Sequence, residues 1–503
     1  MSKKSQQSGQ FLTGNLLSTK EMIMDVIGHN SDVVVHQLYL EALGTHVMII
    51  YIQSLVDKNS VNNQVIRALQ QSQTQTQTAV QSAAIEQQAN RKEQIQQMIQ
   101  LGRMDHVDTL SECIDAILSG QTALFSEGME GGIILGTSGW KTRSIEEPVT
   151  ESVVRGPREG FVEDLDTNIS LLRRRIRNPD FTMINYQIGR QTKRNLVLVY
   201  LSGITNPILV KEVQSRIERI DIDDVPESGY IEQLIEDNPW SPFPQIQNTE
   251  RPDKVVASLM EGRVAILLDG TPFVLLAPVT FPMLLQAPED YYDRWIVGSL
   301  VRMLRYLLVI AGLLLPSLYI ALVSYHQGLI PTKLAISITS SREGVPFPTI
   351  IEALLMEITI EVLREAGIRL PKPIGQAVGI VGGLVIGQSA VQAGIVSPIM
   401  VIIVSFTAIS SFAIPSYSVA IAIRILRFTM MVAASVLGLY GIVLALLLIC
   451  SHVVKLKSFG VNYAGAFVHI KSSNWKDTIL RLPIFMMKRR PQFLRTKNEK
   501  RLS

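Results

Sequence analysis

Three glutamates in the second half of the chain have the spacing of a chemical site. Glu357, Glu361 and Glu365 recur at every fourth position within residues 348–367, and residues four apart share one face of an α-helix. A second row on the same helix is apolar and consists of Leu354, Leu355, Ile358 and Val362. In a symmetric ring, the carboxylates become rings of negative charge that concentrate cations. The alternative is a helix at a membrane surface with a solvated acidic face.

A charge-free, glycine-rich stretch follows at residues 374–396. It is long enough to cross a ~30 Å hydrocarbon core as a helix. One stripe of small residues would let a neighbouring helix approach closely; its predicted packing residues are Gly379, Gly383 and Gly387. The opposite face mixes aliphatic residues with glutamines and consists of Ala377, Val381, Leu384, Gln388 and Gln392.

This mixed face suits a narrow water-filled passage that is closed by an apolar ring, because such a constriction gates by dewetting. Val381 and Leu384 are the predicted gate, about one turn from Gln388. The alternative is that both faces pack on neighbouring helices, with the glutamines as interhelical hydrogen-bonding groups.

The sequence shows none of the common enzymatic motifs. Cys113 and Cys450 form no CxxC pair, and the seven histidines show no HExxH spacing. No GxxxxGK[ST] loop and no GxSxG turn occurs. We therefore expect no enzyme, no catalytic residue, no cofactor and no metal. The net charge of +3 gives no basis for nucleic-acid binding.

Two segments of the first half of the chain share one pattern: a helix, a glycine, and two apolar strands joined by an acidic residue and a glycine. The first has its helix at 106–118 and its strands at 122–126 and 131–136, and the second has them at 252–261, 264–268 and 272–276. Gly120 and Gly128 align with Gly262 and Gly270 at the same offset. Asp-Gly between apolar strands is a strong hairpin signal. The pattern predicts a duplicated α+β module, with chance similarity as the alternative.

The long apolar runs all follow residue 300 and lie at 307–323, 374–396, 398–414 and 429–450. No signal peptide is apparent, and the basic tail after residue 455 should be cytoplasmic by the positive-inside rule. Both termini on one side require an even number of spans, and four fits. Arg424 and Arg427 lie just before the last run, and two charges so close to a membrane span are unusual.

These features predict a multi-domain integral membrane protein in which two cytoplasmic α+β modules precede an α-helical transmembrane domain. A helical pattern at 33–56 belongs to the first module, and a proline loop at 238–253 has Trp240, Phe243 and Ile246 as anchors. The expected divisions are 1–60 (helical part of the first module), 61–104 (glutamine-rich insertion), 105–180 (rest of that module and a connecting helix), 181–292 (second module), 293–454 (transmembrane channel domain) and 455–503 (basic tail).

Four stretches resemble the A subunits of bacterial spore germinant receptors, the GerA family. They are residues 141–157, 241–254, 352–367 and 379–388. The resemblance spans roughly residues 105–485, whereas the glutamine-rich tract before it departs from the family.

The resemblance implies a multi-pass protein of the spore inner membrane whose two amino-terminal subdomains are cytoplasmic. It implies a homo-pentameric ring in the lipid bilayer that conducts monovalent cations and triggers germination when a nutrient is sensed. A partner B subunit similar to amino-acid permeases would sense the nutrient, and a C-subunit lipoprotein would lie on the outer face. A non-conducting scaffold and a secondary transporter are the alternatives. A transporter usually carries paired repeats in its membrane half, and the duplication here lies in the soluble half.

Overall fold

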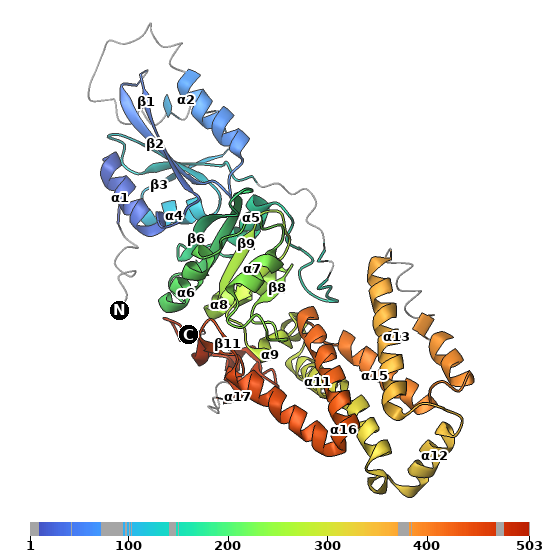
Figure 1. The fold of residues 1–503 in the computed structure, drawn as a ribbon. Helices are drawn as coiled ribbons and strands as arrows, with labels where there is room; N and C mark the ends of the chain where they lie inside the picture. Colours follow the sequence, from blue (N-terminus) through green and yellow to red (C-terminus); the bar gives the residue numbers. More distant parts are fainter. Residues whose placement is uncertain are drawn as a thin grey trace.

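The computed structural model describes residues 10–501 apart from 42, 72–93, 96–97, 100, 102, 140–146, 149, 371–381, 384 and 469–476. Two α+β modules come first along the chain, and a helical region follows, as Figure 1 shows. The predicted order of an α+β half and a helical half is therefore confirmed.

Module 1 is a five-stranded antiparallel sheet with helices on both faces. Its strands are β1 (Val33–Leu40), β2 (Thr45–Ile52), β3 (Met104–Val107), β4 (Thr122–Ser126) and β5 (Gly132–Leu135), in the order β1-β2-β4-β5-β3. One face buries apolar residues against α1 (Leu16–Ile27) and α4 (Leu110–Leu118). The other face packs against the π-helix η2 (Ser60–Ile66) and α2 (Arg67–Gln71).

The helix predicted at 33–56 is wrong, because these residues form the β1–β2 hairpin. Val33, Val34 and Val35 open β1, and β-branched side chains are stiff in a helix but pack well on a pleated sheet. The leucines in this segment recur at a spacing that also fits a helix, and this spacing led to the wrong prediction. The helix predicted at 106–118 also begins later, at Leu110, where the Thr109 hydroxyl accepts a hydrogen bond from Glu112 N.

Module 2 repeats this architecture. Its strands are β6 (Phe181–Ile188), β7 (Arg194–Leu201), β8 (Gln247–Thr249), β9 (Val264–Leu268) and β10 (Val274–Ala277), in the order β6-β7-β9-β10-β8. One face packs against α5 (Leu165–Arg175) and α8 (Pro252–Glu261). The other packs against α6 (Pro207–Glu218) and α7 (Ser228–Ile235).

The two modules have one fold, as the repeated pattern predicts. Leu124 pairs with Ile49 and Ile133, and Ile266 holds the same place between Leu198 and Leu275. The aligned glycines share a left-handed backbone, with φ of +87° and +95° at Gly120 and Gly262 and of +78° and +87° at Gly128 and Gly270. Residues with a Cβ rarely adopt this conformation, so the glycines mark equivalent turns.

In the proline loop, two of the three predicted anchors are buried. Phe243 is 3% exposed and Ile246 is 1% exposed. Trp240 is 94% exposed, so its prediction as an anchor is wrong. The indole follows Pro239 at the tip of the loop, where no element of the described chain covers it.

The helical region begins with α9 (Phe281–Leu284) and α10 (Glu289–Tyr292), followed by α11 (Trp295–Ser324), α12 (Thr332–Arg342), α13 (Thr349–Arg369), α15 (Pro398–Phe412) and α16 (Tyr417–Lys455). Within the described residues, α11 and α16 are the helices long and apolar enough to cross a membrane. The predicted span at 398–414 is the shorter α15, and part of the predicted span at 374–396 lies outside the described residues. Gly438, with φ +60° and ψ −139°, breaks α16 into two arms.

The tail returns to module 2. It contains β11 (Lys457–Ser458), β12 (Val461–Asn462), α17 (Gly465–Val468) and the short 3₁₀ helices η5 (Ile484–Met486) and η6 (Gln492–Leu494). Ser458 Oγ donates to Gln245 O and accepts from Val279 N, and Lys497 N donates to Ile204 O. Figure 1 accordingly places the C-terminus beside module 2.

Candidate functional site

The most buried carboxylate of the predicted acidic row on α13 is Glu357. Both oxygens of Glu357 accept hydrogen bonds from Arg427 Nη1 of α16, at 2.8 and 2.7 Å. Thr407 Oγ1 of α15 donates to the same carboxylate at 3.2 Å. Both charged side chains are only 2% exposed. Breaking a buried ion pair leaves an uncompensated charge, so this contact holds three helices in one arrangement.

The rest of the acidic row is progressively more exposed. Glu361 lies 2.7 Å from Arg424 Nη1 and 3.3 Å from Arg364 Nη1, with its side chain 30% exposed. Glu365 pairs with Arg369 at 2.6 Å, and its side chain is 61% exposed. The two α16 arginines that the sequence alone left without partners are thus the counter-ions of α13. A role of Glu357, Glu361 and Glu365 in attracting cations stays a prediction.

A further glutamate joins this group, one that sequence reasoning missed. Glu352 is fully buried and accepts a hydrogen bond from Ser397 N at 3.0 Å, while Arg342 Nη2 lies 2.8 Å from its other oxygen. It precedes Glu357 by five residues and therefore falls off the row of every fourth residue. Its presence among apolar residues of a helix was the signal that could have identified it.

Part of the predicted pore face lies outside the described residues: Ala377, Val381 and Leu384, together with the packing residue Gly379. Gly387 is buried, and a Cβ added to it would lie 3.3 Å from Val401 Cγ1 of α15. Gly383 has open space around it, and Gln388 and Gln392 are exposed. In the single chain, both glutamines are therefore accessible to solvent. Their assignment to a pore stays a prediction.

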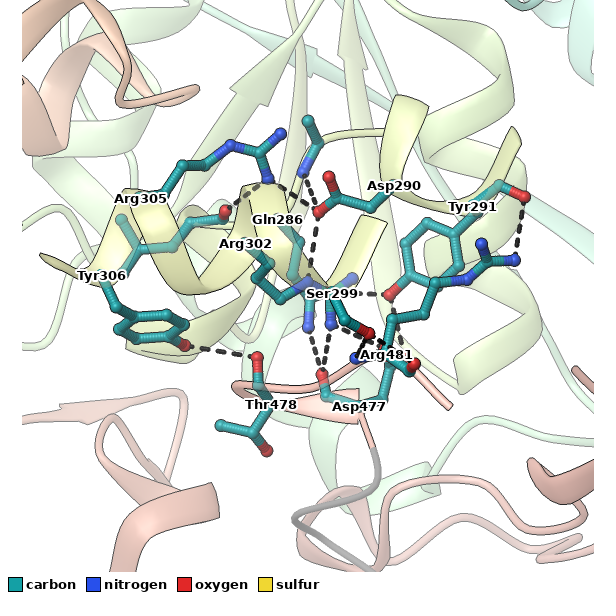
Figure 2. Close-up of polar contacts among 12 residues, drawn as sticks. Gln286, Asp290, Tyr291, Ser299, Arg302, Arg305, Tyr306, Asp477, Thr478 and Arg481 are labelled. Carbon is teal, nitrogen blue, oxygen red and sulfur yellow. Dashed lines mark hydrogen bonds and ion pairs between the residues drawn. The ribbon is translucent and has the colours of Figure 1, made fainter. Parts of the chain in front are cut away.

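A second polar cluster joins α10, the start of α11 and the tail; we call it the tail junction. It consists of Gln286, Asp290, Tyr291, Ser299, Arg302, Arg305, Asp477 and Arg481, most of which Figure 2 shows linked by hydrogen bonds and ion pairs. Arg302, with 0% of its side chain exposed, lies 3.2 Å from Asp290 Oδ2 and 2.8 Å from Asp477 Oδ1. Arg305 Nη1 lies 2.7 Å from Asp290 Oδ2.

Neutral groups complete the tail junction. Tyr291 OH donates to Asp477 Oδ2 at 2.8 Å, and Ser299 Oγ donates to Arg481 O at 2.8 Å. Burial raises the pKa of the Asp477 carboxyl, and the Arg302 guanidinium opposes that rise. Sequence reasoning missed this cluster, because Arg302 and its partner Asp477 are 175 residues apart.

The described part of the chain offers no metal cluster, and its buried cysteine is a poor nucleophile. No group of three or more His, Cys, Asp or Glu side chains there could hold a metal ion. Burial raises the pKa of the Cys113 thiol to about 12, and a thiol that stays protonated is a poor nucleophile.

The comparison with known families decides the identity. The family described as Bacillus/Clostridium GerA spore germination protein matches residues 21–493. The chain belongs to this family. Among its GerA relatives, the spore germination protein GerLA of Bacillus cereus is 44% identical over 487 residues, covering 97% of each chain. The spore germination protein A1 of Bacillus subtilis (strain 168) is 44% identical over 478 residues, covering 95% of each chain.

One solved structure is also similar: the N-terminal domain of the A subunit of the Bacillus megaterium spore germinant receptor GerK3. It is 33% identical, covers 54% of this chain and 98% of that chain, and superposes with a TM-score of 0.41. The GerA resemblance inferred from the sequence is thus confirmed, and the homologues indicate the A subunit of a spore germinant receptor. Family membership together with two apolar helices indicates membrane association.

Proposed function

We propose that this A subunit forms an oligomeric, nutrient-gated cation channel in the spore inner membrane and that its opening triggers germination. The observation that carries the proposal is the pairing of Arg427 and Arg424 with Glu357 and Glu361 among apolar helices. Ionisable residues inside membrane helices are expensive and mark ion or substrate pathways. Arg427 Nε and Nη2 are also buried without a partner among the described residues, which favours water in this helical core.

In this proposal, the glycine-rich helices of a homo-pentamer surround the passage. Gly379, Gly383 and Gly387 pack outward, and Val381 and Leu384 close the passage by dewetting. Gln388, Gln392 and Ala377 line the wetted part, and Glu365 with its neighbours in the acidic row concentrates monovalent cations. A permease-like B subunit supplies the nutrient site and a lipoprotein C subunit binds outside. The packing of the tail on module 2 supports a topology with both ends on the same side of the membrane, and the basic charge of the tail favours the cytoplasm.

Reconstitution of the receptor subunits into liposomes, with ion flux as the readout, tests the channel. Nutrient should start cation flux in the wild type, and Leu384→Ala should leak without nutrient because the apolar constriction is wider. Leu384→Met, which nearly conserves the side-chain volume, is the matched control and should stay closed. Absence of nutrient-dependent flux from a fully assembled receptor would overturn the proposal.

Two substitutions then test the acidic row. Glu365→Lys should change cation selectivity. The amount of assembled receptor should stay the same, because Glu365 is largely exposed. Glu357→Lys should instead lower assembly, because it places a second buried cation beside Arg427. If Glu365→Lys leaves flux and selectivity unaltered, the row has no part in conduction.

A non-conducting scaffold is the second candidate. The pairing of Glu357 and Glu361 with arginines of the same chain is also compatible with this candidate, because it neutralises both carboxylates. A scaffold predicts that receptor assembly persists and that Leu384→Ala causes no leak. A secondary transporter is less favoured, because the internal repeat comprises module 1 and module 2 and neither belongs to the helical region.

A further inference from the structure

The tail exposes an apolar patch immediately before a basic pair. Leu480, Ile484, Phe485 and Met486 are 47%, 60%, 69% and 48% exposed. Lys488 and Arg489 follow, and both are exposed. We call residues 480–489 the foot. Several exposed apolar side chains close together in sequence, followed by basic residues, are typical of segments that lie in the interface of an anionic membrane.

The tail junction fixes where the foot lies. Arg481 Nη1 donates to Asp293 O at 2.7 Å, and Arg481 Nη2 donates to Tyr291 O at 3.1 Å. Arg481 N in turn donates to Ser299 Oγ at 3.1 Å. As a result, Phe485 and Ile484 line one shallow, open depression together with Trp295, the first residue of α11.

The exposed face of α11 indicates the depth at which the foot lies in a bilayer. Its exposed side is apolar from the first turn onward and comprises Trp295, Ile296, Leu300, Leu304 and Leu307. Arg302 and Arg305 turn the other way, into the tail junction. The 30 residues of α11 extend about 45 Å, close to the thickness of a bilayer with its headgroups. Trp295 then lies at one interface, where tryptophan is enriched.

We propose that the foot is a lipid-binding element: Ile484, Phe485 and Met486 insert at headgroup level, while Lys488 and Arg489 bind anionic phospholipid. The inference rests on the membrane association of α11 and goes beyond the proposed channel, since it assigns a ligand class to the tail. Two features favour lipid over a partner protein. The patch is continuous with the apolar outer face of α11, and its charge complements an anionic leaflet.

The test uses the full chain in nanodiscs that contain phosphatidylcholine with or without phosphatidylglycerol. In a Cys113→Ser/Cys450→Ser background, Phe485→Cys carries an environment-sensitive fluorophore. Leu17→Cys of α1 is the matched control, because Leu17 is 70% exposed and belongs to module 1. At position 485, insertion should blue-shift the emission, and lipids spin-labelled near the headgroup should quench it. Both readouts should leave position 17 unchanged. Phosphatidylglycerol should strengthen this quenching, and Lys488→Gln/Arg489→Gln should remove the strengthening.

A third label separates failure of the foot from failure of the membrane assignment. Leu448 of α16 is 72% exposed, so Leu448→Cys should be quenched by lipids labelled in the acyl chain. Quenching at 448 without quenching at 485 overturns the foot and leaves the spanning helices intact. Shielding of 485 from an aqueous quencher without quenching by lipid shows a protein contact and also overturns it. Absence of lipid quenching at both positions overturns the membrane assignment itself.

Discussion

Module 1 and module 2 have the same strand order but use equivalent positions differently. Thr109 caps α4 within module 1, whereas its counterpart Arg251, at the start of α8, makes no cap. The Arg251 guanidinium instead donates to Glu151 O and Pro157 O, outside the repeated unit. A Cβ on Gly120 would meet Leu55 O of module 1, but one on Gly262 would meet Thr496 of the tail. At these two positions module 1 keeps its contacts internal, whereas module 2 contacts the segment that precedes it and the tail that follows the helical region. Module 2 therefore acts as a connector.

The largest loss of stability is expected for a substitution at the contact between the two modules. Arg173 of α5 lies 2.7 Å from Asp32 of module 1, and their side chains are only 1% and 11% exposed. Its guanidinium also lies 4.6 Å from the centre of the Phe181 ring. Arg173→Met leaves a buried carboxylate unpaired, which should cost about 3–5 kcal/mol of stability. The measurement is the denaturation midpoint of the detergent-solubilised chain, combined with proteolysis between the modules.

The control for this change is Arg173→Met/Asp32→Asn, which removes both charges and should recover most of the loss. A single variant that melts like the wild type would show that the modules are held together by other contacts.

Substitutions at the equivalent first positions of α4 and α8 should cause smaller and unequal losses of stability. Arg251 is fully buried and forms hydrogen bonds with Asp253 as well as with the two carbonyls. Arg251→Ala should cost about 3 kcal/mol, because the buried carboxylate of Asp253 loses its counter-ion. Thr109→Ala should cost about 1 kcal/mol, the usual value of a lost N-cap. Thermal midpoints of the two variants check the order, and equal losses would contradict the connector role of module 2.

The third effect depends on pH and on α7, which covers one face of module 2. Burial, reinforced by Glu236 and Glu227, raises the pKa of Glu232 from 4.5 to about 8. The folded state therefore binds a proton that the unfolded state has lost, and stability should fall as the pH rises from about 5 to 8. Glu232→Gln should flatten this slope and raise stability at pH 8 by about 1 kcal/mol.

The thermal midpoint measured across this pH range checks the prediction for Glu232. Glu218→Gln, on the exposed side of α6, is the matched carboxylate control and should keep the wild-type slope. An unchanged slope in Glu232→Gln would assign the pH dependence to other groups.

The smallest effect belongs to the surface contact between the modules. Lys58 lies 3.2 Å from Asp166, and both side chains are more than half exposed. Solvent screens such pairs, so Lys58→Ala should change stability by less than about 0.5 kcal/mol. The melting of Lys58→Ala should be compared in the isolated chain and in the assembled receptor. A loss as large as that of Arg173→Met in the receptor alone would mean that assembly buries the contact.

The sequence predicted those parts of the fold whose signals are local. Pro252 and Gly262 bound α8, and Asp269-Gly270 marks the turn between β9 and β10, as their conformational preferences require. The hairpin at β1 and β2 was missed because its turn lacks an Asn-Gly or Asp-Gly pair. Its apolar residues also match a helical spacing by coincidence.

The candidate site was less predictable, because its contacts are between residues distant in sequence. Glu357 and Arg427 are 70 residues apart, and Arg302 and Asp477 are 175 apart. Composition marks each of these charges as unusual within an apolar run, but nothing local says which charge is the partner. The row of glutamates could be identified from the sequence, whereas its neutralisation could not.

The return of the tail onto module 2 also sets the order in which the chain can be completed during synthesis. Val279 N and Gln245 O obtain their partner, Ser458 Oγ, only after the ribosome has translated the whole helical region. Thr496, which lies against Gly262, is translated later still. Module 2 is therefore among the first parts to emerge and among the last to finish. A chain truncated just before Ser458 would keep all of α11 and α16 yet present an incomplete module 2 to proteases.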